Sequence, residues 1–354
     1  MTTRFDAPDD PALDAFYGQL AESELQPLWR QSGLMPGSPP IADVPFVWRG
    51  QTLRRLAQDA GKLVPIDRGG DRRVLALCNP GLGGLPYATQ TLWGAVQYLG
   101  PGEVAPAHHH TPGALRFVLE GEGVWTLVDG DAVAMRPGDL VLTPSWAWHE
   151  HHNPGNEAML WFDGLDIPLV RALDAVFYED GPDEMTNRAV DVVSRSERRY
   201  AGGPGLVPVG PRAAVAHTPL MAYRREDTDR ALSSLLEQEA GPHVAVRYAD
   251  PTTGRDVMPT LRCEMHRLVP GGRTPTTRRV GSSVWVTYSG AARAVVDGTA
   301  YDLAAGDTLA VPSWAPLDFE AAEPTDLFCL CDAPVLEALG LARSTTLDSY
   351  QTVR

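Results

Sequence analysis

Short apolar runs separated by glycine and proline fill the chain from about residue 73 onward. The runs recur at spacings of roughly 8 to 15 residues, and they are rich in valine, leucine and aromatic residues. In the first half of the chain they read RVLALC, TLWGAVQYL, LRFVLEG, VWTLVDG, DLVLTP and AMLWFDG. Such runs are typical of the strands of an antiparallel barrel or sandwich, so the pattern predicts a fold dominated by β-structure.

Helical spacing of apolar residues is confined to a few segments. The first, over residues 16–29, predicts a helix within an N-terminal arm that we place at 1–72. A second helix is expected to begin after Asp166, whose side chain could cap it. A third is expected over 227–240, where Gly241 and the following proline would end it.

Three short segments of the first half return in the second half at one offset. The pairs are VDG at 128 and 296, PGD and AGD at 137 and 305, and PSWA at 144 and 312. Each pair is 168 residues apart (296 − 128), and a shared offset in three places indicates a duplicated β domain. We therefore predict a first domain with a trailing helix, a linker with a helix, and a second domain, at 73–178, 179–240 and 241–354.

Composition excludes several classes of protein. Of 354 residues 44% are hydrophobic, enough to build a core, and the net charge of −15 argues against nucleic acid or an anionic membrane as a partner. The N-terminal MTTRFDAPDD lacks the features of a signal peptide, so we expect a cytoplasmic protein. The four cysteines form no CxxC pair, which favours buried thiols over disulfides.

Six of the nine histidines fall in two clusters, at 108–110 and 149–152. Because strand side chains alternate between faces, His108 and His110 share a face and can hold one metal ion. His149 and His151 share a face in the same way, and His149 is the candidate third ligand. The alternative is a rim of solvent-facing histidines, which the strand-like surroundings disfavour.

These segments also carry a resemblance to a known family. The string GEVAPAHHH at 102–110 resembles the first cupin motif, and PGDLVLTPSWAWHEHHN at 137–153 resembles the second. Within the cupins the chain is similar to gentisate 1,2-dioxygenase and its salicylate and 1-hydroxy-2-naphthoate relatives. That similarity rests on MP at 35, VW at 47, RRV at 72, NPGL at 79, TLW at 91, LRFV at 115 and WFDGLD at 161. It implies a bicupin, with two double-stranded β-helix (jelly-roll) barrels behind the arm and a few peripheral helices.

The resemblance implies iron(II) bound by His108, His110 and His149. Many cupins add a glutamate four or five residues after the second histidine, but Ala114 and Leu115 stand there. Three neutral imidazoles would leave the ion its full charge, which favours an anionic chelating substrate. The implied reaction joins gentisate and both atoms of O2 into maleylpyruvate.

The second copy departs from the metal-binding pattern. At an offset of 168 the three histidines correspond to Thr276, Arg278 and Leu317, and a slip of one residue gives Thr277 and Arg279 for the first two. None of these sets can bind a transition metal. We expect a structural second barrel in which the two arginines are ion-paired.

The resemblance assigns two arginines to the substrate. Arg116 matches an arginine that clamps the substrate carboxylate, for which the planar guanidinium fork is suited. Arg72 matches a second such arginine, although Arg73 beside it leaves the register open. For both, the alternative is a surface salt bridge of little energetic value.

Four further residues match the pocket of the family. His151 would accept the phenolic proton or hydrogen-bond bound oxygen, unless it only holds His149 or an acid in place. Asp163 would fix His151 or an arginine. Trp93 and Gln97 share one strand face and match pocket-lining positions, with core packing as the alternative for Trp93.

Several functions remain open at the level of sequence. The leading hypothesis is an iron(II) gentisate 1,2-dioxygenase, and a salicylate or 1-hydroxy-2-naphthoate dioxygenase is the alternative within the class. A non-catalytic bicupin that binds an aromatic acid, or a zinc or manganese cupin such as an isomerase, comes from another class. The resemblance further implies a homotetramer or dimer in which the arm contacts other subunits.

Overall fold

The computed structural model describes residues 10–31, 33–66, 73–181, 193–203, 206–210 and 215–354, which fall into two compact units, 1–41 and 42–354. The first unit contains α1 (Pro11–Glu22) and the short helix η1 (Leu28–Arg30). The Asp10 side chain caps α1 by accepting the N–H of Ala12 at 2.9 Å. The helix predicted over 16–29 is confirmed only as far as Glu22, because the backbone turns left-handed at Glu24 (φ 52°).

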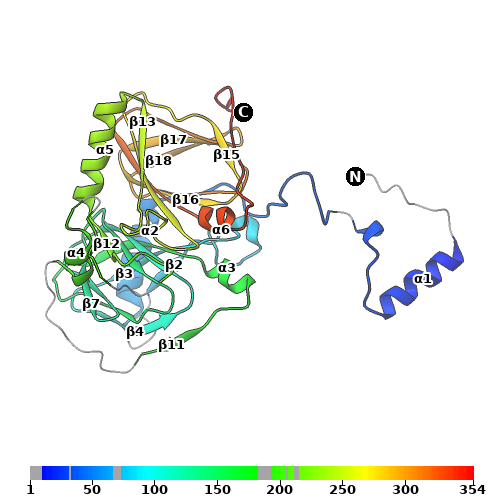
Figure 1. The fold of residues 1–354 in the computed structure, drawn as a ribbon, viewed down its shortest axis with the longest axis horizontal. Helices are drawn as coiled ribbons and strands as arrows, with labels where there is room; N and C mark the ends of the chain where they lie inside the picture. Colours follow the sequence, from blue (N-terminus) through cyan, green and yellow to red (C-terminus); the bar gives the residue numbers. More distant parts are fainter. Residues whose placement is uncertain (1–9, 32, 67–72, 182–192, 204–205, 211–214) are drawn as a thin grey trace. The chain divides into compact units, whose positions relative to one another are not determined.

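The first barrel of the second unit is made of two facing sheets (Figure 1). One sheet has the order β12 (Ala222–Tyr223), β8 (Leu140–Thr143), β5 (Ala114–Glu120), β10 (Met159–Leu165), β3 (Trp93–Leu99), β2 (Val74–Ala76). The other has the order β11 (Tyr178–Asp180), β4 (Val104–His110), β9 (His149–His152), β6 (Trp125–Val128), β7 (Asp131–Ala134). The short helix η4 (Pro80–Leu82) follows β2.

The second barrel repeats this plan. Its larger sheet has the order β1 (Phe46–Trp48), β19 (Thr308–Val311), β16 (Ser283–Ser289), β21 (Thr325–Cys331), β14 (Arg262–Leu268), β13 (His243–Arg247). Its smaller sheet has the order β18 (Thr299–Ala304), β17 (Ala291–Val296), β20 (Leu317–Ala321), β15 (Thr277–Arg279), β22 (Ser344–Thr346). The predicted mostly β fold with duplicated barrels is confirmed.

Unusual backbone conformations recur at the predicted offset. Asp129 and Asp297 both have φ 46°, and each is followed by a glycine with φ 75°, so both copies make the same hairpin turn. Trp146 and Trp314 both have φ 64°, which is rare for a bulky side chain. The duplication therefore extends to the backbone angles.

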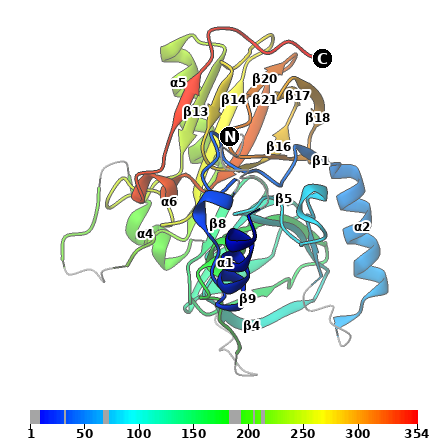
Figure 2. The same ribbon diagram turned by 90° about the vertical axis from the view of Figure 1, so that its right-hand side faces the viewer.

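Apolar cores fill both barrels and the space between them. The interior of the first barrel contains Val118, Val141 and Trp161 among others, and a separate core fills the second. The largest core lies between the two six-stranded sheets, where the rings of Phe117 and Phe328 stack with centroids 4.2 Å apart. The outward faces of the larger sheets thus join the barrels (Figure 2).

Among the described residues, α1 belongs to the first unit and five further α-helices border these sheets. Those of the second unit are α2 (Gly50–Leu63), α3 (Ile167–Ala172), α4 (Arg195–Tyr200), α5 (Arg225–Glu239) and α6 (Ala333–Ala338). The helix expected over 227–240 is α5, and the one expected after Asp166 is α3. The Asp166 carboxylate does not cap α3, because it accepts hydrogen bonds from Gly113 and Thr260 instead. Within the described residues no helix is long and apolar enough to cross a membrane.

Candidate active site

Strand pairing in the first barrel brings three histidines to one point. His108 on β4 lies opposite His149 on β9, and His110 is two residues further along β4. The ring centroids of His108 and His149 are 4.2 Å apart, and those of His110 and His149 are 4.9 Å apart. One ring nitrogen from each of the three lies within 4.8 Å of the others. The structure therefore places together His108 and His110, which strand alternation puts on one face, and His149, the candidate third ligand.

The hydrogen bonds of these rings show which nitrogen of each carries the proton. Every Nδ1 contacts a main-chain carbonyl two residues away: His108 to Pro106 (2.9 Å), His110 to Pro112 (2.7 Å) and His149 to Ala147 (3.0 Å). A carbonyl only accepts, so each Nδ1 carries the proton and each Nε2 presents a lone pair. Nε2 of His149 is buried without a hydrogen-bond partner. This donor set fits a divalent transition metal.

Burial keeps the His110 and His149 imidazoles neutral. It lowers the pKa of His110 to about 4 and holds the pKa of His149 well below its usual 6.5, and the charge of Arg116 lowers both further. A neutral imidazole is the form that binds a metal, so the site is ready for one at neutral pH.

We expect the metal to stay bound well into acid. Protons compete with the ion only below the pKa of the ligands, so release should occur below about pH 4, the pKa of His110, whereas an unperturbed histidine would compete near pH 6.5. Metal content after dialysis across this pH range, with far-ultraviolet circular dichroism as the control for folding, checks this. Release centred near pH 6.5 from a folded protein would contradict it.

A cavity of about 120 Å³ opens beside the histidines. An apolar cavity of about 150 Å³ is known to hold one benzene ring, so this space is on the scale of a single aromatic ring. Its walls are Val74, Trp93, Gln97, Ala105, Pro106, His108, His110, Ala114, Arg116, His151, Asp163 and Leu165. Apart from Arg72 and the more deeply placed His149, every residue that the sequence proposed for the site lines this cavity.

Arg116 is the cation of the cavity. It lies on β5 opposite Asp163 of β10, with its Nε 3.7 Å from the carboxylate, and it donates a hydrogen bond to Thr143. The Nε atom itself is buried without a hydrogen-bond partner. Burial raises the pKa of Asp163 to about 7, although the charge of Arg116 and the N–H of Trp161 lower it. Arg116 is therefore buried and fixed in position by Asp163 and Thr143. Its Nε remains available to bind an anion.

His151 lies beside the metal ligands but is not one of them. Its Nδ1 is 2.7 Å from the hydroxyl of Thr126, and that hydroxyl is 3.1 Å from the sulfur of Met135. If the hydroxyl donates to the sulfur, it accepts from Nδ1 of His151, and the Nε2 lone pair is available in the cavity. Burial holds the pKa of His151 well below 6.5, so the ring is neutral and accepts hydrogen bonds.

Of the two arginines before β2, the structure describes Arg73. Arg72 lies outside the described residues. Arg73 is buried, but its guanidinium pairs with Glu103 and donates to the carbonyls of Gly61 and Val64 at the end of α2. Arg73 therefore does not line the cavity, whereas Val74 does.

Sequence reasoning missed a strand that covers the histidines. β11 pairs with β4, so that Asp180 lies opposite His108, and the ring of Tyr178 stacks on His108 with centroids 5.6 Å apart. The polar composition of 179–215 indicates a surface linker and gives no signal for this strand. His109 points to the other face of β4, where it packs between Trp146 and Trp148 at 3.8 and 3.7 Å.

Proteins of known activity resemble this chain in sequence and in fold. The cupin domain model matches residues 95–167. A gentisate 1,2-dioxygenase of Streptomyces is 54% identical over 94% of this chain and 95% of its own length, and a 1-hydroxy-2-naphthoate 1,2-dioxygenase of Nocardioides is 35% identical over 93% and 86%. The structure of salicylate 1,2-dioxygenase from Pseudoaminobacter salicylatoxidans with gentisate superposes with a TM-score of 0.94 at 47% identity, covering 99% and 98% of the two chains. The chain thus belongs to the gentisate 1,2-dioxygenase family of cupins and is a ring-cleaving dioxygenase.

Proposed function

We propose that the protein is an iron(II)-dependent gentisate 1,2-dioxygenase, which converts gentisate and O2 into maleylpyruvate. The observation that carries this proposal is one cavity, the size of one aromatic ring, beside three histidines whose ring nitrogens lie within 4.8 Å of one another, with a buried guanidinium in its wall. Iron(II), when held by His108, His110 and His149, supplies the chelation of the substrate and the activation of dioxygen.

Arg116 binds the carboxylate of the substrate. Its unpartnered Nε and the fork of the guanidinium suit a two-point contact with a carboxylate, and Asp163 and Thr143 fix the plane of the group. Because Arg116 is buried, its charge is little screened by water. Arg116 therefore orients the ring so that the carboxylate and the adjacent hydroxyl face the histidines.

His151 receives the phenolic hydrogen. Its neutral ring accepts a hydrogen bond at Nε2 while Thr126 holds Nδ1. The low pKa makes His151 a weak base, so it would accept a hydrogen bond from the phenolic hydroxyl and position it toward a metal held by the three histidines. Trp93 and Gln97 close the cavity on the side of β3.

The preference for gentisate rests on the Streptomyces relative and on the size of the cavity. Salicylate is the second candidate, since the salicylate dioxygenase of Pseudoaminobacter has nearly the same fold and 47% identity. The fused rings of 1-hydroxy-2-naphthoate fit a space of about 120 Å³ less well.

Oxygen uptake by the iron-loaded enzyme with each of the three acids tests the proposal. We expect the highest kcat/KM on gentisate, a lower value on salicylate and the lowest on 1-hydroxy-2-naphthoate. The same assay after reconstitution with zinc or manganese tests the metal, because three imidazoles also suit zinc. Absence of uptake with iron and all three acids, or full activity with zinc, would contradict the proposal.

We further propose that the protein is a homo-oligomer held together partly by residues 10–41. No residue of α1 is buried, and apolar side chains such as Trp29, Leu34 and Met35 are exposed, Met35 to 81%. A run of exposed apolar side chains commonly marks a protein contact. Light scattering should give a mass of more than one chain, reduced by Trp29→Ser with Met35→Ser. A monomeric wild-type protein would contradict this.

A further inference from the structure

A second cavity lies in the second barrel, at the place that corresponds to the metal site. Thr277 of β15 pairs with Leu317 of β20, as His108 pairs with His149. Arg279, two residues along β15, therefore occupies the position of His110. The main chain agrees, because the carbonyl of Arg279 accepts the N–H of Trp314 at 2.7 Å, as that of His110 accepts the N–H of Trp146 at 2.8 Å.

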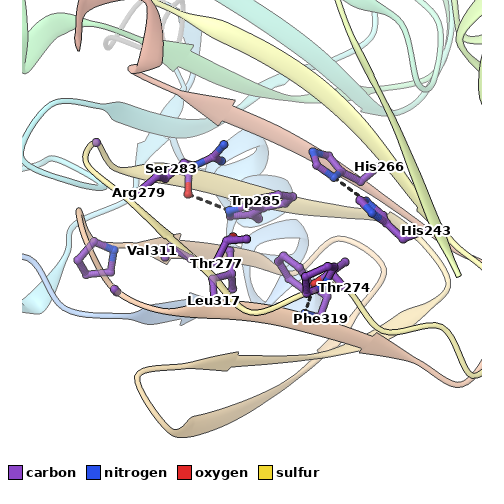
Figure 3. Close-up of a pocket in the computed structure, with 14 residues that line it drawn as sticks. His243, His266, Thr274, Thr277, Arg279, Ser283, Trp285, Val311, Leu317 and Phe319 are labelled. Carbon is purple, nitrogen blue, oxygen red and sulfur yellow. Dashed lines mark hydrogen bonds between the residues drawn. The ribbon is translucent and has the colours of Figure 1, made fainter. Parts of the chain in front are cut away.

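The cavity has a volume of about 150 Å³ and a largely apolar wall. Trp285 on β16 pairs with Cys329 as Arg116 pairs with Asp163, so an indole stands where the first barrel has its guanidinium. Leu317 and Phe319 extend the apolar wall. Figure 3 shows Arg279 and Trp285 on one side of this space and His243 and His266 at its far end. Arg279 thus stands where the first barrel has the ring of His110, and the ring of Trp285 stands where the first barrel has the guanidinium of Arg116.

Arg279 lacks a carboxylate partner among the described residues. The structure gives its guanidinium one hydrogen bond, to the sulfur of Cys329 at 3.7 Å, and sulfur is a weak acceptor. Arg278 points elsewhere and lies over the ring of Trp314 at 4.8 Å. The expectation that both arginines are ion-paired in this barrel is therefore wrong for the part of the chain described. Glu264, which is hydrogen-bonded to His266, acts on Arg279 only through its charge, so the guanidinium has no carboxylate in direct contact and is suited to bind an anion.

The far end of the cavity carries a pair of histidines that contacts the Glu264 carboxylate. Nε2 of His266 is 3.0 Å from the carboxylate of Glu264, and Nδ1 of His266 is 2.9 Å from Nε2 of His243. Since the carboxylate accepts, His266 carries a proton on Nε2, and Glu264 balances any charge on this ring. Burial lowers the pKa of His243 to about 4, so this histidine is neutral at pH 7. Among the residues that line the cavity, Arg279 is therefore the cation with no hydrogen-bonded carboxylate.

We propose that this cavity binds a small aromatic monocarboxylate, with the carboxylate on Arg279 and the ring against Trp285 and Phe319. The volume is on the scale of one benzene ring, and an indole provides the flat contact that aromatic rings prefer. This binding site requires no metal, and it does not rest on the function proposed for the first barrel.

Equilibrium dialysis of the iron-loaded protein with labelled benzoate tests the proposal, because benzoate has the carboxylate and the ring but no hydroxyl for chelation. We expect Arg279→Gln to bind fewer benzoate molecules than the wild-type protein, with a difference of one per chain. Arg278→Gln is the matched control and should bind the same number as the wild-type protein. Benzamide, which has the same shape without the charge, should not displace this benzoate. Equal binding by Arg279→Gln and wild type would overturn the proposal.

A crystal structure of the wild-type protein with saturating benzoate does not depend on the folding of a variant. We expect benzoate in the second barrel with its carboxylate on the Arg279 guanidinium. A cavity that holds only water or a buffer anion under these conditions would overturn the proposal. Neither experiment measures turnover, so failure of the proposed gentisate activity would not be mistaken for failure of this site.

Discussion

Replacement of His110 by alanine is expected to remove the metal and abolish oxygen uptake. His110 belongs to the group of three histidines that the described residues offer to a metal, and its loss leaves two ligands for the ion. Changes to outer partners of metal ligands already cost about 10- to 100-fold in affinity or activity, so removal of a ligand should cost more than about a hundredfold. Metal content of the purified protein and oxygen uptake with gentisate measure both effects.

His152→Ala is the matched control for this experiment. His152 comes from the same pair of histidine clusters, but its ring stacks on Trp125 with centroids 4.0 Å apart and lies outside the ligand set. We expect this variant to keep its metal. Full metal content in His110→Ala, or equal loss in both variants, would show that the three-histidine site is assigned wrongly.

Arg116→Ala should keep the metal and lose kcat/KM. Truncation of one partner of a buried charge pair costs about 2–5 kcal/mol, so we expect a fall of roughly 30- to several thousandfold in kcat/KM. The metal should remain because Arg116 is not within the ligand set and the three rings keep their main-chain hydrogen bonds. Metal content together with steady-state kinetics separates the two outcomes.

Arg116→Lys refines this test. Lysine keeps the charge but lacks the planar fork, so its kcat/KM should lie between those of wild type and Arg116→Ala. Loss of the metal from Arg116→Ala would show instead that the arginine supports the ligands, and unchanged kcat/KM would show that it does not bind the substrate.

The metal site could be found from the sequence because it depends on local rules. Strand alternation alone places His108 and His110 on one face, and the pairing of β4 with β9 then adds His149. Arg116 and Asp163 were matched as separate motifs, yet they are direct neighbours across β5 and β10. The sequence does not show that pairing, because it depends on which strands of the barrel lie side by side.

The register of the second barrel could not be fixed from the repeat. β5 ends at Glu120 and β16 ends at Ser289, an offset of 169 (289 − 120), whereas β6 and β17 end at Val128 and Val296, an offset of 168 (296 − 128). The first copy has one more residue in the turn between these strands. The motifs used to find the repeat all lie after that turn. Their offset of 168 therefore pairs His110 with Arg278, one residue before Arg279, which occupies the corresponding position in the structure.

The strand β11 could not be predicted for a different reason. It is three residues long, exposed and polar, and only its pairing with β4 makes it a strand. Non-local contact determines its structure, and a single sequence carries no periodic signal for it. The cover that it provides over His108 is therefore a finding of the structure alone.

The central claim is that the first barrel opens the aromatic ring with both atoms of dioxygen. Turnover of gentisate by the iron-loaded enzyme under ¹⁸O-labelled dioxygen, followed by mass spectrometry of the product, tests it most directly. We expect a ring-opened acid that carries both labelled atoms, with equal consumption of oxygen and gentisate. A hydroxylated product with an intact ring, or a product with a single labelled atom taken directly from dioxygen, would contradict it.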